Sequence, residues 1–267
     1  MKKQLVIING VTGAIGSALM EKYGQKKNVV IFGLTRKALS WRDFVGSKAG
    51  KLPLVTFLCS VAFDIQDVAD FIGNINFEEF SRVTYVHCVG AYLFEIDSEG
   101  HFEIEGDNDK DGINDVVKFL SYDVLSLFSK NIILRAKNNI DCVIFGGLAD
   151  RHQPRILYSW WNTMEKTEAF MKENASGKVG MFKFDISSVF CPHELLMRPF
   201  VFTQTDADQT AWLSPSMLAS EVVRTLNVNN HGGFHKNDVF RHWEGFSAEY
   251  YMDQQMVPRR LAETINK

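Results

Sequence analysis

Short apolar runs recur along the chain, and the longer segments between them carry apolar residues at helical spacing. Such runs predict β-strands, because each is about four to eight residues long, rich in Val, Ile and Phe, and bounded by turn-forming residues. The predicted strands span residues 4–8, 29–34, 54–58, 82–88, 141–145 and 179–184, with a further strand near 238–243.

The intervening segments predict helices near residues 16–23, 67–72, 114–136, 158–173 and 215–226. Strands that alternate with helices indicate βαβ crossovers, which produce a parallel sheet with helices on both faces. The predicted fold class is therefore α/β, a doubly wound, Rossmann-like parallel sheet. A chain of 267 residues can form this fold as a single domain, and we expect one domain over residues 1–267.

Three regions depart from the alternating pattern. Residues 95–115 hold nine acidic residues and one lysine, which predicts a solvated excursion after the fourth strand. Within it, DNDKDGINDVVK resembles the start of a calcium-binding EF-hand loop, but Lys118 replaces the glutamate required at position twelve, so a polar loop is the favoured interpretation. Residues 187–215 are expected on the substrate side, and 227–267 form an irregular C-terminal region.

Composition narrows the function classes. The net charge of −3, without a basic stripe, argues against nucleic-acid binding. No apolar run approaches the roughly 20 residues that span a bilayer, and the N-terminal run is interpreted as a strand rather than a signal peptide. The four cysteines form no CxxC pair and the C-terminal histidines have no ligand spacing, so we expect no metal site. The expected location is the cytoplasm, where thiols stay reduced.

The run LVIINGVTGAIGSALM places Gly10, Gly13 and Gly16 after the first predicted strand and at the start of a helix. Glycines at these positions let the chain turn, let backbone amides approach a pyrophosphate, and let the helix pack closely on the strand. The positive end of the helix then faces the phosphates. A tight strand-to-helix turn without a ligand would also select these glycines. We predict a dinucleotide site that includes Thr12 and Ile15.

The end of the second strand carries information on the cofactor. NAD-binding sites usually place Asp or Glu there to accept a hydrogen bond from the ribose 2′-hydroxyl. This chain has Thr35, Arg36 and Lys37 instead, and their two cations suit the additional 2′-phosphate of NADP. The alternative is an ordinary basic start of a surface helix. The predicted cofactor is NADP.

These features together resemble the short-chain dehydrogenase/reductase superfamily over residues 3–226. The glycine spacing is similar to that of its extended and atypical branches. The resemblance implies further cofactor contacts: an Asp–hydrophobe pair at the adenine, and the residues that stand where the family has Asn-Asn-Ala-Gly after the fourth strand. In this chain the pair is Asp64 and Ile65, and the four later positions are His87, Cys88, Val89 and Gly90, of which only Gly90 matches the family's residue.

The resemblance also implies a catalytic set, from which this chain departs. In the family, a tyrosine acts as general acid/base, a lysine four residues later lowers its pKa, and a serine polarises the carbonyl group. Tyr158 matches the tyrosine, but Asn162 stands at the lysine position and Gly147 at the usual serine position. Ser121 aligns with the asparagine that the family carries on the preceding long helix.

A tyrosine needs a nearby cation to act at neutral pH. Ketoreductase domains of polyketide synthases resemble this chain in having YxxxN, with the lysine donated by the preceding long helix. Lys118 lies three residues before Ser121 and is the candidate for that role. The alternative is that Lys118 is solvated at the start of the helix.

The sequence therefore predicts an NADP(H)-dependent oxidoreductase that acts on the carbonyl or hydroxyl group of a small or carrier-bound substrate. A catalytically substituted homologue, which binds the dinucleotide for a structural or regulatory role, is the second hypothesis. A non-redox reaction on the same scaffold is the third. The resemblance implies a homodimer or homotetramer formed through the two long helices.

Overall fold

The computed structural model describes residues 3–35, 56–60, 64–89, 95–96, 102–103, 118–147, 158–186, 189, 213–229 and 232–239. Its centre is a seven-stranded sheet in the order β3-β2-β1-β4-β7-β8-β9. All neighbouring strands in this sheet are parallel. The strands are β1 (Lys3–Asn9), β2 (Val29–Thr35), β3 (Thr56–Ser60), β4 (Phe80–His87), β7 (Asn139–Gly147), β8 (Val179–Ile186) and β9 (Gly233–Val239).

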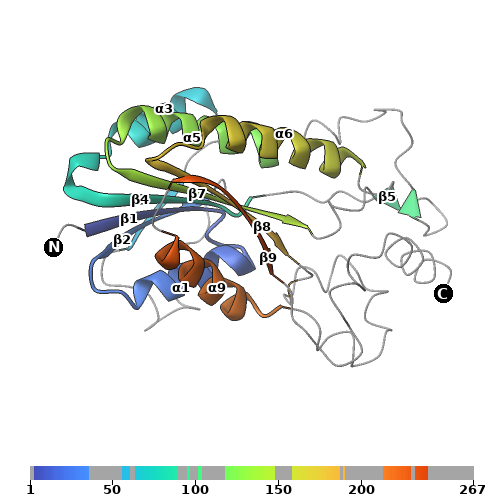
Figure 1. Ribbon diagram of the computed structural model, residues 1–267, viewed down its shortest axis with the longest axis horizontal. Coiled ribbons are helices and arrows are strands. Elements are labelled where there is room, and N and C mark those ends of the chain that lie inside the picture. Colours follow the sequence, from blue (N-terminus) through green and yellow to red (C-terminus); the bar gives the residue numbers. More distant parts are fainter. Residues whose placement is uncertain are drawn as a thin grey trace.

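Helices cover both faces of the sheet (Figure 1). The helices α3 (Ile65–Gly73), α5 (Val124–Arg135) and α6 (Tyr158–Asn174) lie on one face, and α1 (Ala14–Gly24) and α9 (Pro215–Val228) lie on the other. This arrangement confirms the predicted doubly wound α/β fold. The strand order reverses between β1 and β4, and ligands of such folds bind at the carboxyl end of the strands beside that point.

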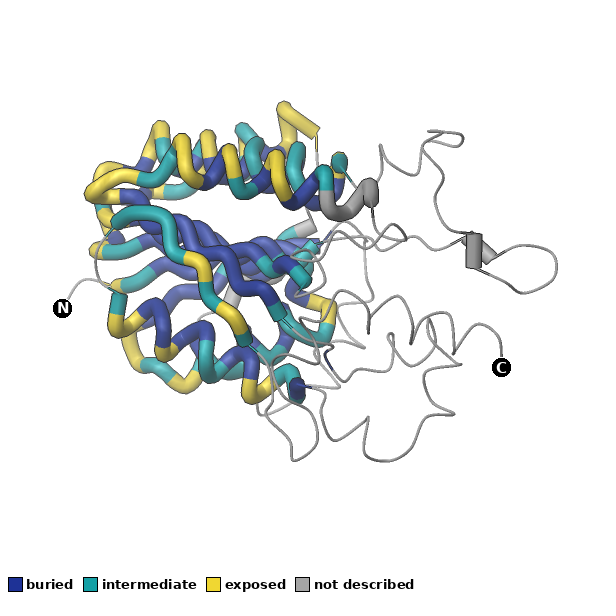
Figure 2. Tube along the Cα trace, turned by 45° about the vertical axis from the view of Figure 1, so that its right-hand side comes forward, coloured by how far each residue is buried: buried dark blue, intermediate teal, exposed yellow. Residues whose placement is uncertain are grey.

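The core consists of two apolar layers separated by the sheet, because successive strand residues point to opposite faces. In β1, Leu5 and Ile7 belong to the layer under α3, α5 and α6, whereas Val6 and Ile8 belong to the layer over α1 and α9. Figure 2 shows the resulting pattern, in which the central strands are buried and the outward sides of the helices are exposed.

Some elements differ from their predicted positions. The last strand was expected near residues 238–243, but β9 begins at Gly233. A short antiparallel pair, β5 (Glu95–Ile96) with β6 (Phe102–Glu103), lies in the acidic segment and was not predicted. The long helix predicted over 114–136 is described from Lys118 and contains a π-helical segment, η2 (Phe119–Asp123), before α5.

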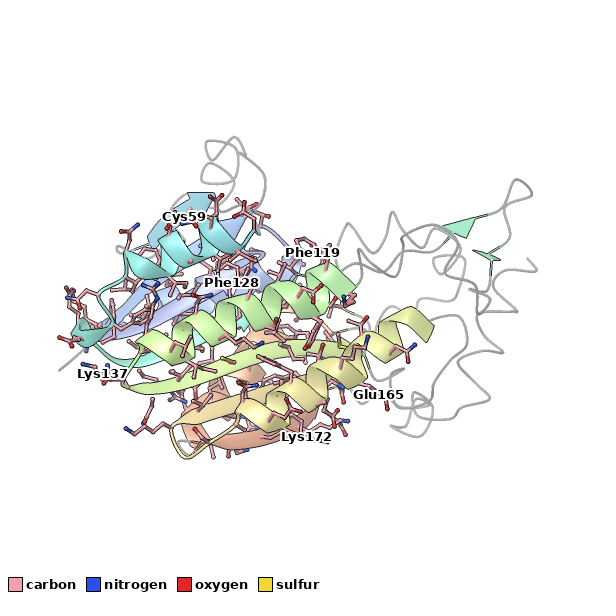
Figure 3. The ribbon with its side chains drawn as sticks, turned by 90° about the horizontal axis from the view of Figure 1, so that it is seen from above. Cys59, Phe119, Phe128, Lys137, Glu165 and Lys172 are labelled. Carbon is pink, nitrogen blue, oxygen red and sulfur yellow. The ribbon has the colours of Figure 1, made fainter. Side chains whose placement is uncertain are left out.

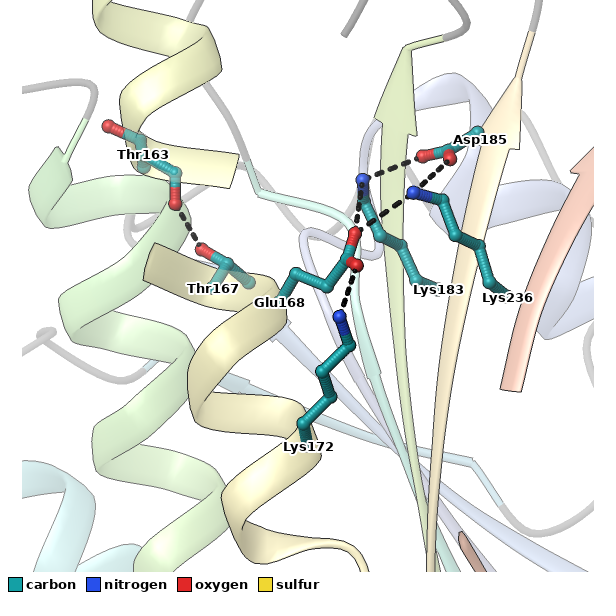
Figure 4. A network of polar contacts seen from close by, with 7 residues as sticks. All are labelled: Thr163, Thr167, Glu168, Lys172, Lys183, Asp185 and Lys236. Carbon is teal, nitrogen blue, oxygen red and sulfur yellow. Dashed lines mark hydrogen bonds and ion pairs between the residues drawn. The ribbon is translucent and has the colours of Figure 1, made fainter. Parts of the chain in front are cut away.

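A network of charges explains why β9 does not look like a strand in the sequence (Figure 4). The carboxylate of Glu168 on α6 lies 3.0 Å from the Lys236 ammonium of β9 and 3.4 Å from that of Lys183 on β8. Lys183 is in turn 3.0 Å from Asp185. Lys183 and Asp185 are both buried. Lys236 of β9 therefore pairs with charges under α6, and hydrophobic patterning does not reveal such a strand.

No helix within the residues that the structure describes is both long and apolar enough to cross a membrane.

Candidate functional site

The glycine turn between β1 and α1 has a geometry that requires glycine. Gly10 has φ of 83°, a conformation that side-chain-bearing residues rarely adopt. A Cβ atom added to Gly10 would lie 2.9 Å from the carbonyl oxygen of Cys88, and one added to Gly16 would lie 2.3 Å from the carbonyl oxygen of Gly10. The backbone approaches itself so closely here that any larger residue would displace the turn.

The N-terminus of α1 is arranged to receive an anion. The residue that caps the helix is Gly13, which offers no side chain to the amides of the first turn, and that turn contains no acidic residue. Amides at this position have no partner within the helix and carry its positive partial charge. Gly16 is buried, Ile15 is half-buried and Thr12 is exposed. The turn can therefore hold a phosphate group through backbone N–H groups.

The ends of β2 and β4 meet this turn. The carbonyl oxygen of Leu34 accepts hydrogen bonds from the amides of Gly10 and Val11, at 3.0 and 3.2 Å, and the next residue, Thr35, is buried. On the other side, the amide of Cys88 donates to the carbonyl oxygen of Asn9 at 2.9 Å. The structure thus brings Gly10, Thr35 and Cys88, which follow or end three neighbouring strands, to one edge of the sheet.

The predicted adenine contacts begin α3. The carboxylate of Asp64 accepts a hydrogen bond of 2.8 Å from the amide of Asp67 and so caps the helix. Ile65 is 76% exposed, although it is a large apolar residue. An exposed isoleucine fits a role as a surface for an adenine ring. Of the other predicted cofactor residues, Arg36, Lys37 and Gly90 lie outside the residues that the structure describes.

The half of the site that would carry the chemistry lies on η2, α5 and α6. Figure 3 shows these helices from above, with α5 between α3 and α6 and Phe119 near the start of η2. Ser121 is buried, and its hydroxyl has no hydrogen-bond partner in the described part of the chain. Lys118 is half-exposed, and its ammonium lies 3.7 Å from the carboxylate of Asp123. The observed partner of Lys118 is thus an acidic residue on its own helix.

Helix α6 packs with a different face from the one that carries Asn162. Its buried positions include Thr163 and Thr167, whereas Glu165 and Lys166 are exposed and Asn162 is half-buried. Tyr158 is the first residue of α6, and its side chain lies outside the described part of the structure. Helical spacing places positions 158 and 162 on the same side of the helix.

The usual serine position offers only backbone groups. Gly147 is the last residue of β7 and pairs with Ile186 at the end of β8. A row of hydrogen-bonded polar side chains on the buried face of β1 and β4 was not predicted from the sequence. Asn9, Tyr85 and His87 are all buried, and the Tyr85 hydroxyl is hydrogen-bonded to both Asn9 and His87. The sequence feature that could have indicated this row is Tyr85 and His87, two residues apart in an otherwise apolar part of β4.

The described residues contain no group of three His, Cys, Asp or Glu side chains that could hold a metal ion. The segment that resembles an EF-hand loop lies outside those residues except for Lys118.

Comparison with known proteins connects this fold to solved structures. No family model matches the chain, and neither does any curated protein sequence. A short-chain dehydrogenase/reductase from Brucella melitensis is similar in structure, with a TM-score of 0.66 and 18% identity over 90% of this chain and 97% of that one. A serine dehydrogenase in complex with NADP+ gives a TM-score of 0.68 at 10% identity, over 91% and 98% of the two chains. A short-chain type dehydrogenase/reductase from Mycobacterium ulcerans gives 0.66 at 10% identity, over 89% and 90%. This chain shares their fold.

Proposed function

We propose that this chain is a cytoplasmic, NADP(H)-dependent oxidoreductase that acts on the carbonyl or hydroxyl group of a small or carrier-bound substrate. The observation that carries the proposal is the glycine turn at the point where the strand order reverses. There, Gly10 and Gly16 leave no room for a Cβ atom, and a helix begins with no acidic residue in its first turn. The structural similarity to a dehydrogenase in complex with NADP+ supports the proposal.

The residues of this edge fit a dinucleotide. The amides of the first turn of α1 would hold the pyrophosphate, the exposed Ile65 would contact the adenine, and Arg36 and Lys37 would pair with the 2′-phosphate. When bound, the nicotinamide cofactor supplies or accepts a hydride. The part of this chain would be to hold the carbonyl oxygen and to move one proton at the hydroxyl of Tyr158.

Titration calorimetry with NADPH and NADH tests the cofactor preference. We expect NADPH to bind more tightly, and Arg36→Ala to weaken NADPH binding by about 1.5–3 kcal/mol, the range for hydrogen bonds to charged groups, with little effect on NADH. Equal affinity of the unmodified protein for both cofactors would contradict the NADP assignment. Binding of neither cofactor would contradict the proposed function as a whole.

A second candidate function is dinucleotide binding without redox chemistry. It is favoured by the pairing of Lys118 with Asp123 and by the glycine at the usual serine position. Turnover of a panel of carbonyl compounds with NADPH separates the two functions. The redox proposal expects turnover that Tyr158→Phe abolishes while NADPH affinity stays unchanged, because the variant removes only the proton-transfer group. NADPH binding without turnover of any compound would support the second function.

A further inference from the structure

A buried chain of hydrogen bonds joins β1, β4 and η2 on the face of the sheet under α5. The side-chain amide nitrogen of Asn9 lies 3.3 Å from the hydroxyl oxygen of Tyr85, which lies 3.0 Å from Nδ1 of His87. Nε2 of His87 lies 2.8 Å from the carbonyl oxygen of Leu120. The ring of Tyr85 also stacks on Phe128 of α5, with ring centroids 5.3 Å apart. The chain thus ends on the helical turn that precedes α5.

The chemistry of the partners fixes the direction of each hydrogen bond. A carbonyl oxygen only accepts, so Nε2 of His87 donates to Leu120. In a neutral imidazole the other nitrogen is then an acceptor, and it takes the hydroxyl hydrogen of Tyr85. Asn9 donates to the hydroxyl oxygen of Tyr85. Burial lowers the pKa of His87 to about 4, against the raising effect of backbone groups of Leu120 and Val89, so the ring is neutral at pH 7.

The carbonyl group of Leu120 lies where the helix is π-wound. In an α-helix the amide of Val124 donates to the carbonyl oxygen four residues earlier, which is that of Leu120. Here the amide of Val124 donates to Phe119 instead. Such π-turns inside helices are found frequently at functional sites. His87 supplies the side-chain donor that this turn uses.

The same turn carries Ser121, the residue next to Leu120. Ser121 is 3% exposed, and its hydroxyl has no partner in the described part of the chain. It therefore retains hydrogen-bonding capacity within a buried setting, at the position that resembles the family's asparagine. We propose that His87 is a positioning residue, whose Nε2–H holds the Leu120 carbonyl group and thereby fixes the π-turn that presents Ser121 to the candidate site. The role given to Ser121 rests on the proposed function, whereas the role of His87 in the turn does not.

This series of hydrogen bonds does not transfer a proton onward, because it ends at the carbonyl oxygen of Leu120, which only accepts. The contribution of His87 is geometric. Two substitutions of His87 separate its contact with Tyr85 from its contact with Leu120. In His87→Gln the side-chain amide reaches about as far as Nε2 and can still donate to Leu120. In His87→Asn it reaches only as far as Nδ1, which keeps the contact to Tyr85 and removes the one to Leu120.

The test is amide hydrogen exchange of residues 119–125, measured by NMR on the full chain. We expect His87→Asn to accelerate exchange there by about tenfold, which corresponds to the loss of one buried hydrogen bond, and His87→Gln to restore slow exchange. Equal acceleration in both variants, or in neither, would overturn the proposal. The imidazole nitrogen signals of the unmodified protein give an answer that needs no variant: a hydrogen on Nε2 is expected, and one on Nδ1 would contradict the assignment.

Activity then distinguishes this inference from the proposed function. If the carbonyl panel is turned over, His87→Asn should lower kcat at least about tenfold with little change in KM for NADPH, and His87→Gln should recover most of it. A kcat that responds equally to both variants would contradict the positioning role. A protein that turns over no compound but shows the expected exchange pattern would contradict the proposed reaction and leave the assignment of His87 to the π-turn standing.

Discussion

The two halves of the candidate site differ in the groups that form them, which are backbone groups in one half and side chains in the other. The half beside β1 and α1 uses the backbone: Gly10 and Gly16 are required by steric contact, and amides supply the positive charge. The half beside η2 and α6 relies on side chains, and there the expected residues are exchanged, with Asn162 and Gly147 at the usual lysine and serine positions. A site made of backbone keeps its sequence pattern because few residues fit it. A site made of side chains can change its chemistry without changing the fold.

Gly16→Ala tests the backbone half of the site, and we expect it to cause the largest losses of stability and of NADPH affinity. Its Cβ atom would lie 2.3 Å from the carbonyl oxygen of Gly10, so the turn must shift, at a cost of about 3 kcal/mol in the free energy of unfolding. NADPH affinity should fall more than about tenfold because the first-turn amides move with it. Chemical denaturation and calorimetry measure the two effects.

Gly177→Ala is the matched control, since a Cβ atom there would meet nothing within 4 Å. We expect unchanged NADPH binding and a stability change of at most about 1 kcal/mol, in the stabilising direction. If Gly16→Ala behaved like Gly177→Ala, the turn would not be constrained as described.

The next largest effect is a loss of stability at acidic pH, which we expect from His87 in the hydrogen-bonded row between the two halves. The pKa of His87 is lowered by burial from 6.5 to about 4, so between these values the unfolded chain binds a proton that the folded chain does not. Stability from this group is therefore complete above pH 6.5 and is lost as the pH falls towards 4, by about 3 kcal/mol in total. His87→Gln cannot titrate, and its denaturation midpoint should depend less on pH in this range. An identical pH dependence in both proteins would show that His87 is not buried as a neutral ring.

A smaller effect is expected where α6 is held to the edge of the sheet. Burial acts to raise the pKa of Glu168, but hydrogen bonds from Lys172 and Lys236 lower it to about 2, so the group is charged at pH 7. Glu168→Gln removes the charge that faces the buried Lys183 and should cost about 2 kcal/mol of stability. Glu221→Gln is the control, because the partner of Glu221 is the exposed Arg224, and no measurable loss is expected. Equal losses in the two variants would argue against a buried network.

The smallest effect is expected from Lys118→Met. The side chain of Lys118 is 44% exposed and its ammonium pairs with Asp123, and such surface pairs contribute less than about 1 kcal/mol. We expect little change in stability and no shift in the alkaline limb of a pH–rate profile. An upward shift of that limb would show that Lys118 supplies the cation for Tyr158 in the working enzyme, as polyketide synthase ketoreductases suggest.

The sequence predicted most of the sheet because buried parallel strands are nearly continuous apolar runs. Prediction was wrong on the position of the last strand, because His235 and Lys236 interrupt the apolar pattern of β9 and find partners only in the folded protein. The glycine turn was recognisable since its glycines lie close together in the chain, at positions 10, 13 and 16. The His87–Leu120 contact was not, because it joins residues 33 positions apart through a carbonyl group that carries no residue-specific signal.

The most direct test of the central claim is an NMR titration of the full chain with NADPH that follows the backbone amides. The largest shifts are predicted at Gly10, at the first turn of α1 from Ala14 to Gly16, and at Ile65, all on the carboxyl edge of the sheet. Residues at the amino edge of the sheet, such as Ser81 and Lys178, should not respond. Shifts confined to the amino edge, or none at saturating NADPH, would contradict a dinucleotide site at the glycine turn.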